Sequence, residues 1–174
     1  MVLPHKFAHF CTVNLHLSAA AEKDISTIQD LAREIWNDHY PAIIGREQVD
    51  YMLNRMYAAD SMLQQMQSGQ QFFLVMENEN PIGFASVENK GQGKYFLNKC
   101  YIKTTLQRSG VGSYVIHEIL KKYEDCRELR LQVNRQNYKA INFYFKMGFV
   151  IEQVADFDIG DGYFMNDFMM LLKR

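Results

Sequence analysis

Two closely spaced glycines at the start of a predicted helix are the clearest indication of a functional site in this sequence. Gly110 and Gly112 follow an extended run that ends at Ile102, and apolar residues at helical spacing come after them. Glycine destabilises a helix unless its bare backbone is needed for a positive φ or for the close approach of a ligand. The first turn of a helix carries unpaired N–H groups and a partial positive charge, so a phosphate is its natural ligand. We therefore predict an anion-binding turn, suited to a diphosphate.

A Gly-x-Gly pair on its own is often only a tight turn, and spacing alone leaves this alternative open. Two common phosphate-binding motifs are excluded. The chain has no Gly-x4-Gly-Lys-Ser/Thr, and no third glycine completes Gly-x-Gly-x-x-Gly, because position 115 is valine. What remains is Gln107-x-x-Gly110-x-Gly112 directly after a predicted strand, which is a narrower pattern.

A second group of polar residues begins at another predicted junction between a strand and a helix. Asn137 lies at the head of a helix, Ala140 and Tyr144 lie on its following turns, and Gly148 ends it. Asparagine at that position is a common helix cap, and tyrosine is a common core aromatic. Both structural interpretations stay open from these residues alone. A tyrosine hydroxyl, with a usual pKa of about 10, is also a suitable proton donor.

The elements that must position these residues form a single predicted α/β domain over residues 1–174. Apolar residues at helical spacing predict helices over 20–38, 46–57 and 61–67, from the glycines to about 123, and over 137–147. Runs rich in β-favouring residues and bounded by turn residues predict strands over 7–17, 72–76, 82–87, 94–103, 128–134, 149–159 and 163–172. This order favours a mixed, mostly antiparallel sheet with helices beside it.

Composition argues against several classes of protein. The chain has 174 residues and a formal net charge of -1, which does not indicate a nucleic-acid partner. The cysteines are scattered and the histidines have no convincing ligand spacing, so neither a disulfide framework nor a metal site is predicted. The N-terminus has no signal-peptide pattern, and no apolar run approaches membrane-spanning length. We therefore expect a soluble, cytoplasmic protein without a membrane partner, and its exposed apolar share leaves room for a homodimer.

The two glycine- and asparagine-containing patterns together resemble the GCN5-related N-acetyltransferase (GNAT) superfamily. The resemblance covers roughly residues 72–149. It implies an α/β (α+β) fold with a mixed, mostly antiparallel central sheet of about six to seven strands, flanked by helices. The closing segment 155–169, with 133–140, is similar to the bacterial spermidine/spermine N-acetyltransferase subgroup. One position departs from the family pattern, because Thr104 stands where a proline often follows the key strand.

The resemblance implies a site for acetyl-CoA as co-substrate, with no metal. Backbone groups of Cys100, Tyr101 and Ile102 would contact the pantetheine arm, which Asn137 would also bond. Tyr144 would be the general acid that protonates the departing thiolate. The helix mouth would hold the pyrophosphate through Gln107, Arg108, Ser109, Gly110, Val111, Gly112 and Ser113.

The implied reaction is transfer of the acetyl group to a small-molecule primary amine, by direct attack in a ternary complex. A polyamine such as spermidine or spermine is the acceptor that the subgroup implies. Other acceptors stay open, namely a protein N-terminus, an amino acid or an antibiotic, and a non-catalytic acyl-CoA-binding sensor is a further alternative. An alkylamine is protonated at neutral pH, so a base is needed. The candidates, besides a water relay, are Glu34, Asp38, Glu88 and Asp167.

Overall fold

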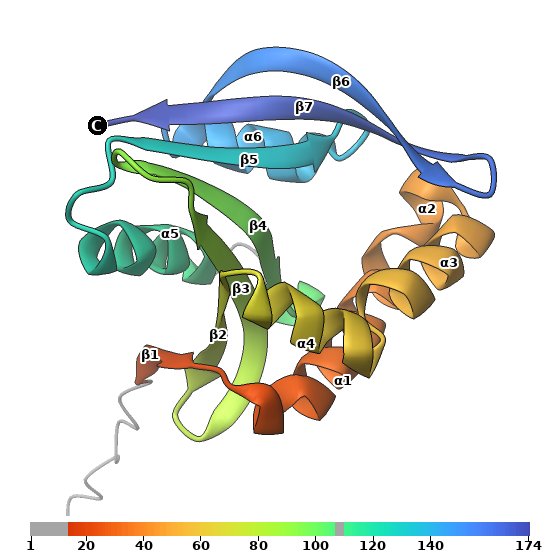
Figure 1. The fold of residues 1–174 in the computed structure, drawn as a ribbon, viewed down its shortest axis with the longest axis horizontal. Coiled ribbons are helices and arrows are strands. Elements are labelled where there is room, and N and C mark those ends of the chain that lie inside the picture. The colour runs from red at the N-terminus through yellow and green to blue at the C-terminus, as the bar shows by residue number, and fades with distance from the viewer. Residues whose placement is uncertain (1–13, 107–109) are drawn as a thin grey trace, which may run out of the picture.

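One mixed sheet runs through the computed structural model, which describes residues 14–106 and 110–174 (Figure 1). The strands lie in the order β1-β2-β3-β4-β5-β7-β6, and each neighbouring pair is antiparallel except β4 with β5. The mixed, mostly antiparallel sheet of the sequence analysis is therefore confirmed. The strand bounds are β1 (Leu15–Ala19), β2 (Gln70–Glu77), β3 (Asn80–Asn89), β4 (Lys94–Ile102), β5 (Glu128–Asn134), β6 (Val150–Gly160) and β7 (Tyr163–Lys173).

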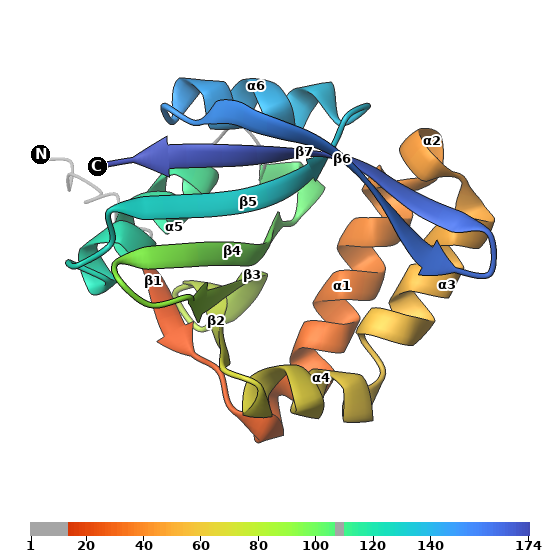
Figure 2. The same cartoon turned by 45° about the horizontal axis from the view of Figure 1, so that its top comes forward.

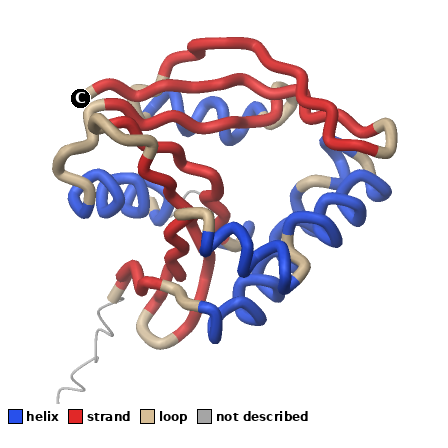
Figure 3. Tube along the Cα trace, in the orientation of Figure 1, coloured by secondary structure: helices blue, strands red, loops and turns tan. Residues whose placement is uncertain are grey.

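The helices cover both faces of this sheet, as Figure 3 shows in blue against red strands. Helices α5 and α6 pack on one face, whereas α1, α3 and α4 pack on the other. Short 3-10 turns, η1 (Glu22–Asp24) and η2 (Thr104–Leu106), precede α1 and α5. The helix bounds are α1 (Ile25–His39), α2 (Pro41–Ile44), α3 (Arg46–Met56), α4 (Ala59–Gln67), α5 (Val111–Lys122) and α6 (Tyr138–Lys146).

The parallel pair β4–β5 separates partway along its length. Residues 94–97 of β4 pair with residues 128–131 of β5, and the register ends there. Both strands continue, β4 to Ile102 and β5 to Asn134, while the ribbons diverge (Figure 2). Strand β4 also contains a bulge, because Ser86 of β3 pairs with Lys99 and the next residue, Val87, pairs with Leu97. The divergence opens the sheet at its centre.

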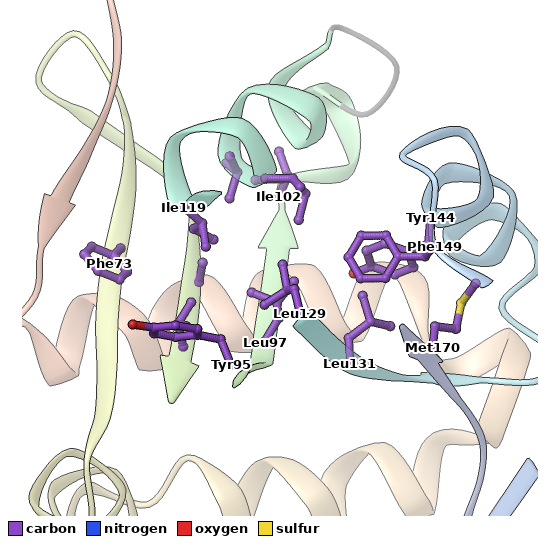
Figure 4. Packing of buried hydrophobic residues seen from close by; sticks show 14 of the residues in the cluster. Phe73, Tyr95, Leu97, Ile102, Ile119, Leu129, Leu131, Tyr144, Phe149 and Met170 are labelled. Carbon is purple, nitrogen blue, oxygen red and sulfur yellow. The ribbon is translucent and has the colours of Figure 1, made fainter. Parts of the chain in front are cut away.

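The core beneath α5 and α6 is continuous across this opening. Figure 4 shows Leu97 and Leu129 meeting below α5, and Tyr144 and Phe149 side by side next to Met170. Burial of such side chains contributes about 1.5–3 kcal/mol each, which makes this cluster the main support of both site helices. Its fully buried members include Val75, Ala85, Val115, Ile116, Leu129, Leu131 and Met170.

The core on the opposite face is richer in aromatic residues and contains one buried cation. Lys99 is only 4% exposed, and its Nζ donates to Gln65 Oε1 at 2.6 Å. The ammonium also lies over the rings of Phe72 and Tyr57, at 5.3 and 5.9 Å from their centroids. The apolar members around it include Ile28, Ala32, Trp36, Val49, Met62 and Phe84.

The first strand and first helix differ from their predicted bounds. Within the described residues β1 begins at Leu15 and continues to Ala19, while the predicted residues 7–13 lie outside that part of the chain. Ala19, beyond the predicted end of the strand, pairs with Phe73, and the N–H of Ala20, which was expected to begin the helix, donates to Phe72 O at 2.9 Å, so this segment extends the sheet pairing instead. Sheet pairing overrides the helix propensity of alanine here.

A helical turn at α2 was not predicted. No helix was predicted between the helices expected over 20–38 and 46–57, and the first of these ends at His39. Pro41 then begins a new turn, since its fixed φ suits the first helical position and its missing N–H is not needed there. The turn ends at Gly45, whose φ of 82° breaks the helix before α3.

Candidate active site

A pocket of about 150 Å³ lies where β4 and β5 diverge, and we call it the inner pocket. Residues of helices α1 to α3, of α6 and of β7 complete its walls. The pocket therefore joins segments that lie far apart in the sequence. The residues that sequence analysis predicted for the site and that line the pocket are Cys100, Tyr101, Ile102, Asn137, Tyr144 and Asp167.

The exposed edge of β4 in this pocket is a stretch of strand without a strand neighbour on its β5 side among the described residues. Pairing with β5 stops at Leu97, so the following backbone groups on that edge face the divergence. Cys100 and Ile102 turn toward the α5–α6 layer, whereas Tyr101 turns toward the aromatic layer. An extended ligand can add to such an edge by main-chain hydrogen bonds.

The N-terminus of α5 lies beyond the end of β4, and Gly110 is its N-cap. Gly110 has a φ of 87°, and a Cβ added there would meet no described atom within 4 Å. The first N–H groups of the helix, on Val111, Gly112 and Ser113, come before the i→i−4 ladder starts at Tyr114. Among the described residues, nothing therefore fills the space beside Gly110 at the positive end of the helix dipole. The predicted residues Gln107, Arg108 and Ser109 lie outside the described part of the chain.

At Gly112 a side chain would collide with the second site helix, a constraint that the motif alone did not indicate. A Cβ built on Gly112 would lie 3.1 Å from Cζ of Phe143 on α6. The glycine therefore allows α5 to approach the ring of the second site helix. Close helix packing accounts for this glycine, and the positive φ accounts for Gly110.

Asn137 is buried at the head of α6 and serves as its N-cap. Its Oδ1 accepts from the Ala140 N–H at 3.2 Å, so the capping interpretation is what the structure shows. The same oxygen lies 3.3 Å from Nε2 of His39, at the end of α1. Because an amide oxygen can only accept, His39 Nε2 is assigned the proton in this contact. Burial lowers the pKa of His39, the bond to Asn137 opposes that shift, and the neutral ring is favoured.

The contact between His39 and Asn137 was missed by sequence analysis. The two residues are 98 positions apart, and the sequence pattern around His39 indicated only the end of a helix and no metal set. A histidine directly before Tyr40-Pro41, at the end of an amphipathic helix, was the available signal, but it did not reveal the partner.

Tyr144 lies on the pocket face of α6 with its ring packed in the core. It is 8% exposed, and its ring centroid lies 5.1 Å from that of Phe143 and 5.4 Å from that of Phe149. Burial raises the pKa of its hydroxyl well above the usual value, and Cys100 and Tyr40 add to the rise. The phenol therefore stays protonated at neutral pH and can only donate a proton there.

Of the four candidate bases, Asp167 lines the inner pocket. It is 6% exposed on β7, and burial raises its pKa to about 6; Arg135 opposes the rise and Asp156 adds to it. A carboxylate with that pKa is ionised at neutral pH yet can accept a proton. Sequence alone could not separate it from the other three.

The remaining three candidates have structural partners outside the pocket lining. Glu34 pairs with Lys103 at 2.9 Å, and Glu88 pairs with Lys90 at 2.6 Å. Asp38 accepts from the Thr104 hydroxyl at the start of η2. Their carboxylates are thus explained by surface ion pairs and a hydrogen bond.

A group of aromatic residues lines the inner pocket together with Asp167, and it was also missed. Trp36 stacks on Tyr40 with ring centroids 4.6 Å apart, and Tyr101 lies 5.6 Å from Trp36. Burial raises the pKa of Tyr40 to about 12, which keeps its hydroxyl neutral. These rings give the pocket an apolar side, against which a buried carboxylate interacts strongly with a cation.

Two negative findings apply to the described residues. No three His, Cys, Asp or Glu side chains in residues 14–106 and 110–174 gather as a metal site would require. None of the helices in that part is both long and apolar enough to cross a bilayer.

Comparison with known proteins places the fold and the site in context. The family model of the acetyltransferase (GNAT) domain matches residues 42–157. The spermidine N(1)-acetyltransferase of Thermoplasma acidophilum is 25% identical over 156 residues, which are 84% of this chain and 94% of that protein. A crystal structure of the PaiA N-acetyltransferase of the same organism with coenzyme A has a TM-score of 0.76 and 26% identity, covering 92% of this chain and 99% of that one.

A second solved structure supports the fold alone. It is a GCN5-related N-acetyltransferase from Rhodopseudomonas palustris, with a TM-score of 0.77 and 18% identity. The match covers 96% of this chain and all of that one, 100%. The described elements from β1 to β7 therefore have counterparts throughout a protein of similar length.

Proposed function

We propose that this chain, which belongs to the GCN5-related N-acetyltransferase family and is an acetyl-CoA-dependent N-acetyltransferase, acetylates a polyamine such as spermidine or spermine. The observation that carries the proposal is Asp167, a buried carboxylate that lines the inner pocket together with Tyr144. A buried anion beside an aromatic wall attracts an ammonium group. Similarity to a spermidine N(1)-acetyltransferase, at 25% identity, also supports a polyamine acceptor.

Binding of acetyl-CoA follows from the exposed edge of β4 and the mouth of α5. The pantetheine arm would add beside Cys100, Tyr101 and Ile102, where β5 has turned away. The pyrophosphate would lie before Gly110, against the N–H groups of Val111, Gly112 and Ser113. Gln107, Arg108 and Ser109 keep the pyrophosphate role that the motif predicts. Asn137 uses Oδ1 for the cap and for His39, and its side chain also bonds the Tyr40 hydroxyl, so the second N–H of Nδ2 is the group that would donate to pantetheine.

The chemical step is a direct acyl transfer in the ternary complex. The ammonium loses a proton to Asp167, the neutral nitrogen attacks the thioester carbonyl, and the C–N bond forms as the C–S bond breaks. Tyr144 gives its proton to the departing thiolate, and the second amine proton leaves to solvent. The pKa values of the two groups suit these roles. Asp167, with a pKa of about 6, is ionised and can accept a proton, whereas the Tyr144 phenol, with its raised pKa, is protonated and can donate one.

The first test is release of free thiol from acetyl-CoA with a panel of acceptors. The panel holds spermidine, spermine, a monoamine of similar length, several amino acids and short peptides. Preferential turnover of the polyamines supports the proposal. Preferential turnover of an amino acid or a peptide refutes the polyamine acceptor and leaves the family reaction intact.

Tyr144→Phe tests the acid. We expect kcat to fall by roughly 100-fold, because a general acid typically contributes a factor of that size, while the KM for acetyl-CoA stays unchanged. Tyr138→Phe is the matched control, since Tyr138 is on the same helix but 70% exposed. Equal turnover of the two variants would remove Tyr144 from the acid role.

Location and assembly belong to the same proposal. Cys100 and Cys126 are free thiols, as expected in the reducing cytoplasm. Ile151 and Val154 of β6 and Phe145 of α6 are exposed apolar side chains on the α6 side of the sheet, which supports a homodimer through this side. Light scattering and cell fractionation test the two statements separately.

A further inference from the structure

A second pocket adjoins the inner pocket on the outer side of the β6–β7 hairpin, and we call it the outer pocket. Its volume is about 400 Å³, and it shares Ile44, Gln48 and Asn134 with the inner pocket. Phe164 and Asn166 of β7 form one of its walls, and the loop after β5 forms another. Since both pockets use the same three residues, they lie on one path between α2 and the end of β7.

Apart from Lys173 at the end of β7, the charged residues of the hairpin beside this pocket are all acidic. Between residues 150 and 172 there is no lysine or arginine. Asp156 lies opposite Asn166 in the strand register, so its side chain is on the outer-pocket side of the hairpin, whereas Asp167 is on the inner-pocket side. The acidic residues of the hairpin are Glu152, Asp156, Asp158, Asp161 and Asp167.

One cation faces the carboxylates from the loop after β5. Arg135 lines the outer pocket, and its guanidinium pairs with Asp156. The pair is partly open to solvent, with side-chain exposures of 33% for Arg135 and 56% for Asp156. A partly exposed ion pair is weak, so a competing cation can replace Arg135 at little cost. Glu152, in contrast, is held by two bonds from Arg130 at 2.8 Å.

We propose that the outer pocket binds the distal ammonium group of the polyamine, with Asp156 as its carboxylate and Arg135 as the cation that it displaces. This inference rests on the proposed function. The reacting amine lies at Asp167 and the methylene chain passes Gln48 and Ile44 at the junction of the pockets. The Asp156 carboxylate then pairs with the second cationic centre, and Arg135 moves toward solvent.

A carboxylate of the acceptor bound by Arg135 is the competing arrangement. It would place an anion between Asp156 and Asp167, whose like charges oppose it. An added cation experiences the reverse field, which is why the structure favours a polyamine over an amino acid at this pocket. A monoamine would use the inner pocket alone.

The test compares acceptors that share one reacting amine but differ in the second. Propylamine has no distal cation, putrescine and cadaverine have one, and spermidine has two. We expect Asp156→Asn to lower kcat/KM for spermidine by about fivefold, the scale of a partly exposed ion pair, and to leave propylamine unchanged. Arg135→Gln should raise kcat/KM for spermidine about threefold, because the competing cation is gone.

The assays are run near pH 8.5, well above the pKa of about 6 of Asp167, so that changes in its ionisation do not mix with the result. Asp161→Asn is the matched control, because Asp161 is at the hairpin turn, whereas Asp156 pairs with Arg135 of the outer-pocket wall. Two results would overturn the outer subsite. One is an equal fall in kcat/KM for spermidine and for propylamine in Asp156→Asn. The other is an equal kcat/KM for the two amines in the wild type. Failure of every polyamine as a substrate, with turnover of another amine, would instead overturn the proposed function.

Discussion

Asn137 shows how one side chain serves structure and site together. Its oxygen caps α6 and meets His39 of α1, so the amide cannot rotate without losing both bonds. The cap could be predicted from sequence, since asparagine before a helix is a common signal. The partner at the end of α1 could not, because nothing local relates two residues 98 positions apart.

The raised pKa of Asp167 leads to a prediction about the pH dependence of turnover. Burial raises its pKa from 3.8 to about 6, so the carboxylate that accepts the amine proton is lost as pH falls through about 6. We expect kcat to decline on that acidic side. Asp167→Asn should lower kcat by roughly 100-fold, because the amide accepts no proton. The decline of kcat at acidic pH should also be absent from this variant. Asp158→Asn, on the same hairpin, is the control and should keep it.

The same shift predicts the sign of a stability effect. Between pH 3.8 and about 6 the unfolded carboxyl is ionised while the folded one still holds its proton. The folded state therefore binds more protons, and this residue makes the protein less stable as pH rises through that window. In Asp167→Asn the contribution disappears. Urea unfolding of both proteins at several pH values measures it, and identical pH profiles would contradict the raised pKa.

At the scale of elements, the glycine-led helix was predicted in both place and type. The strand-turn-helix order from β4 to α5 was readable because the apolar period changes beside a glycine pair. The reason for each glycine was not readable, because Gly112 is bare to admit Phe143, a residue of another helix. The helical turn α2 was missed for a related reason: proline both ends one helix and begins the next.

Gly110→Val tests the anion-binding turn. Valine in the left-handed region is strained by about 1–2 kcal/mol, and its side chain would occupy the open space before the helix. We expect CoA to bind at least tenfold more weakly by calorimetry. Gly162→Val is the control, since Gly162 has a similar φ of 79° and open surroundings but lies at the β6–β7 turn. Equal CoA affinity in both variants would contradict the assignment of the loop.

At the scale of the whole molecule, two hydrophobic layers enclose the sheet, and one of them contains Lys99. Sequence placed this lysine in a strand but could not show which way it faces, because the bulge between Leu97 and Lys99 changes the alternation. Its burial against Gln65 rather than a carboxylate lowers its pKa to about 8.

Lys99→Met should stabilise the protein. At neutral pH the variant removes a buried charge without an ionic partner, and we expect a gain of roughly 2 kcal/mol in the free energy of unfolding. In the wild type, the unfolded lysine holds its proton between pH 8 and 10.5 when the folded one has lost it, so stability rises with pH there. That rise should be absent from the variant. Lys94→Met, at the exposed start of β4, is the control, and an equal change in both would contradict the buried-charge explanation.

Because β4 and β5 diverge, part of the centre of the sheet has no strand-to-strand hydrogen bonds among the described residues. Pairing beyond Leu97 is missing on that edge within the described chain, and an extended pantetheine arm would supply it. In that arrangement the co-substrate would connect the two halves of the sheet. Amide hydrogen exchange at the free edge should slow when CoA is bound. Resistance of the folded enzyme to proteolysis in the cell should then follow the concentration of acetyl-CoA, so the supply of substrate would also set how long the enzyme lasts.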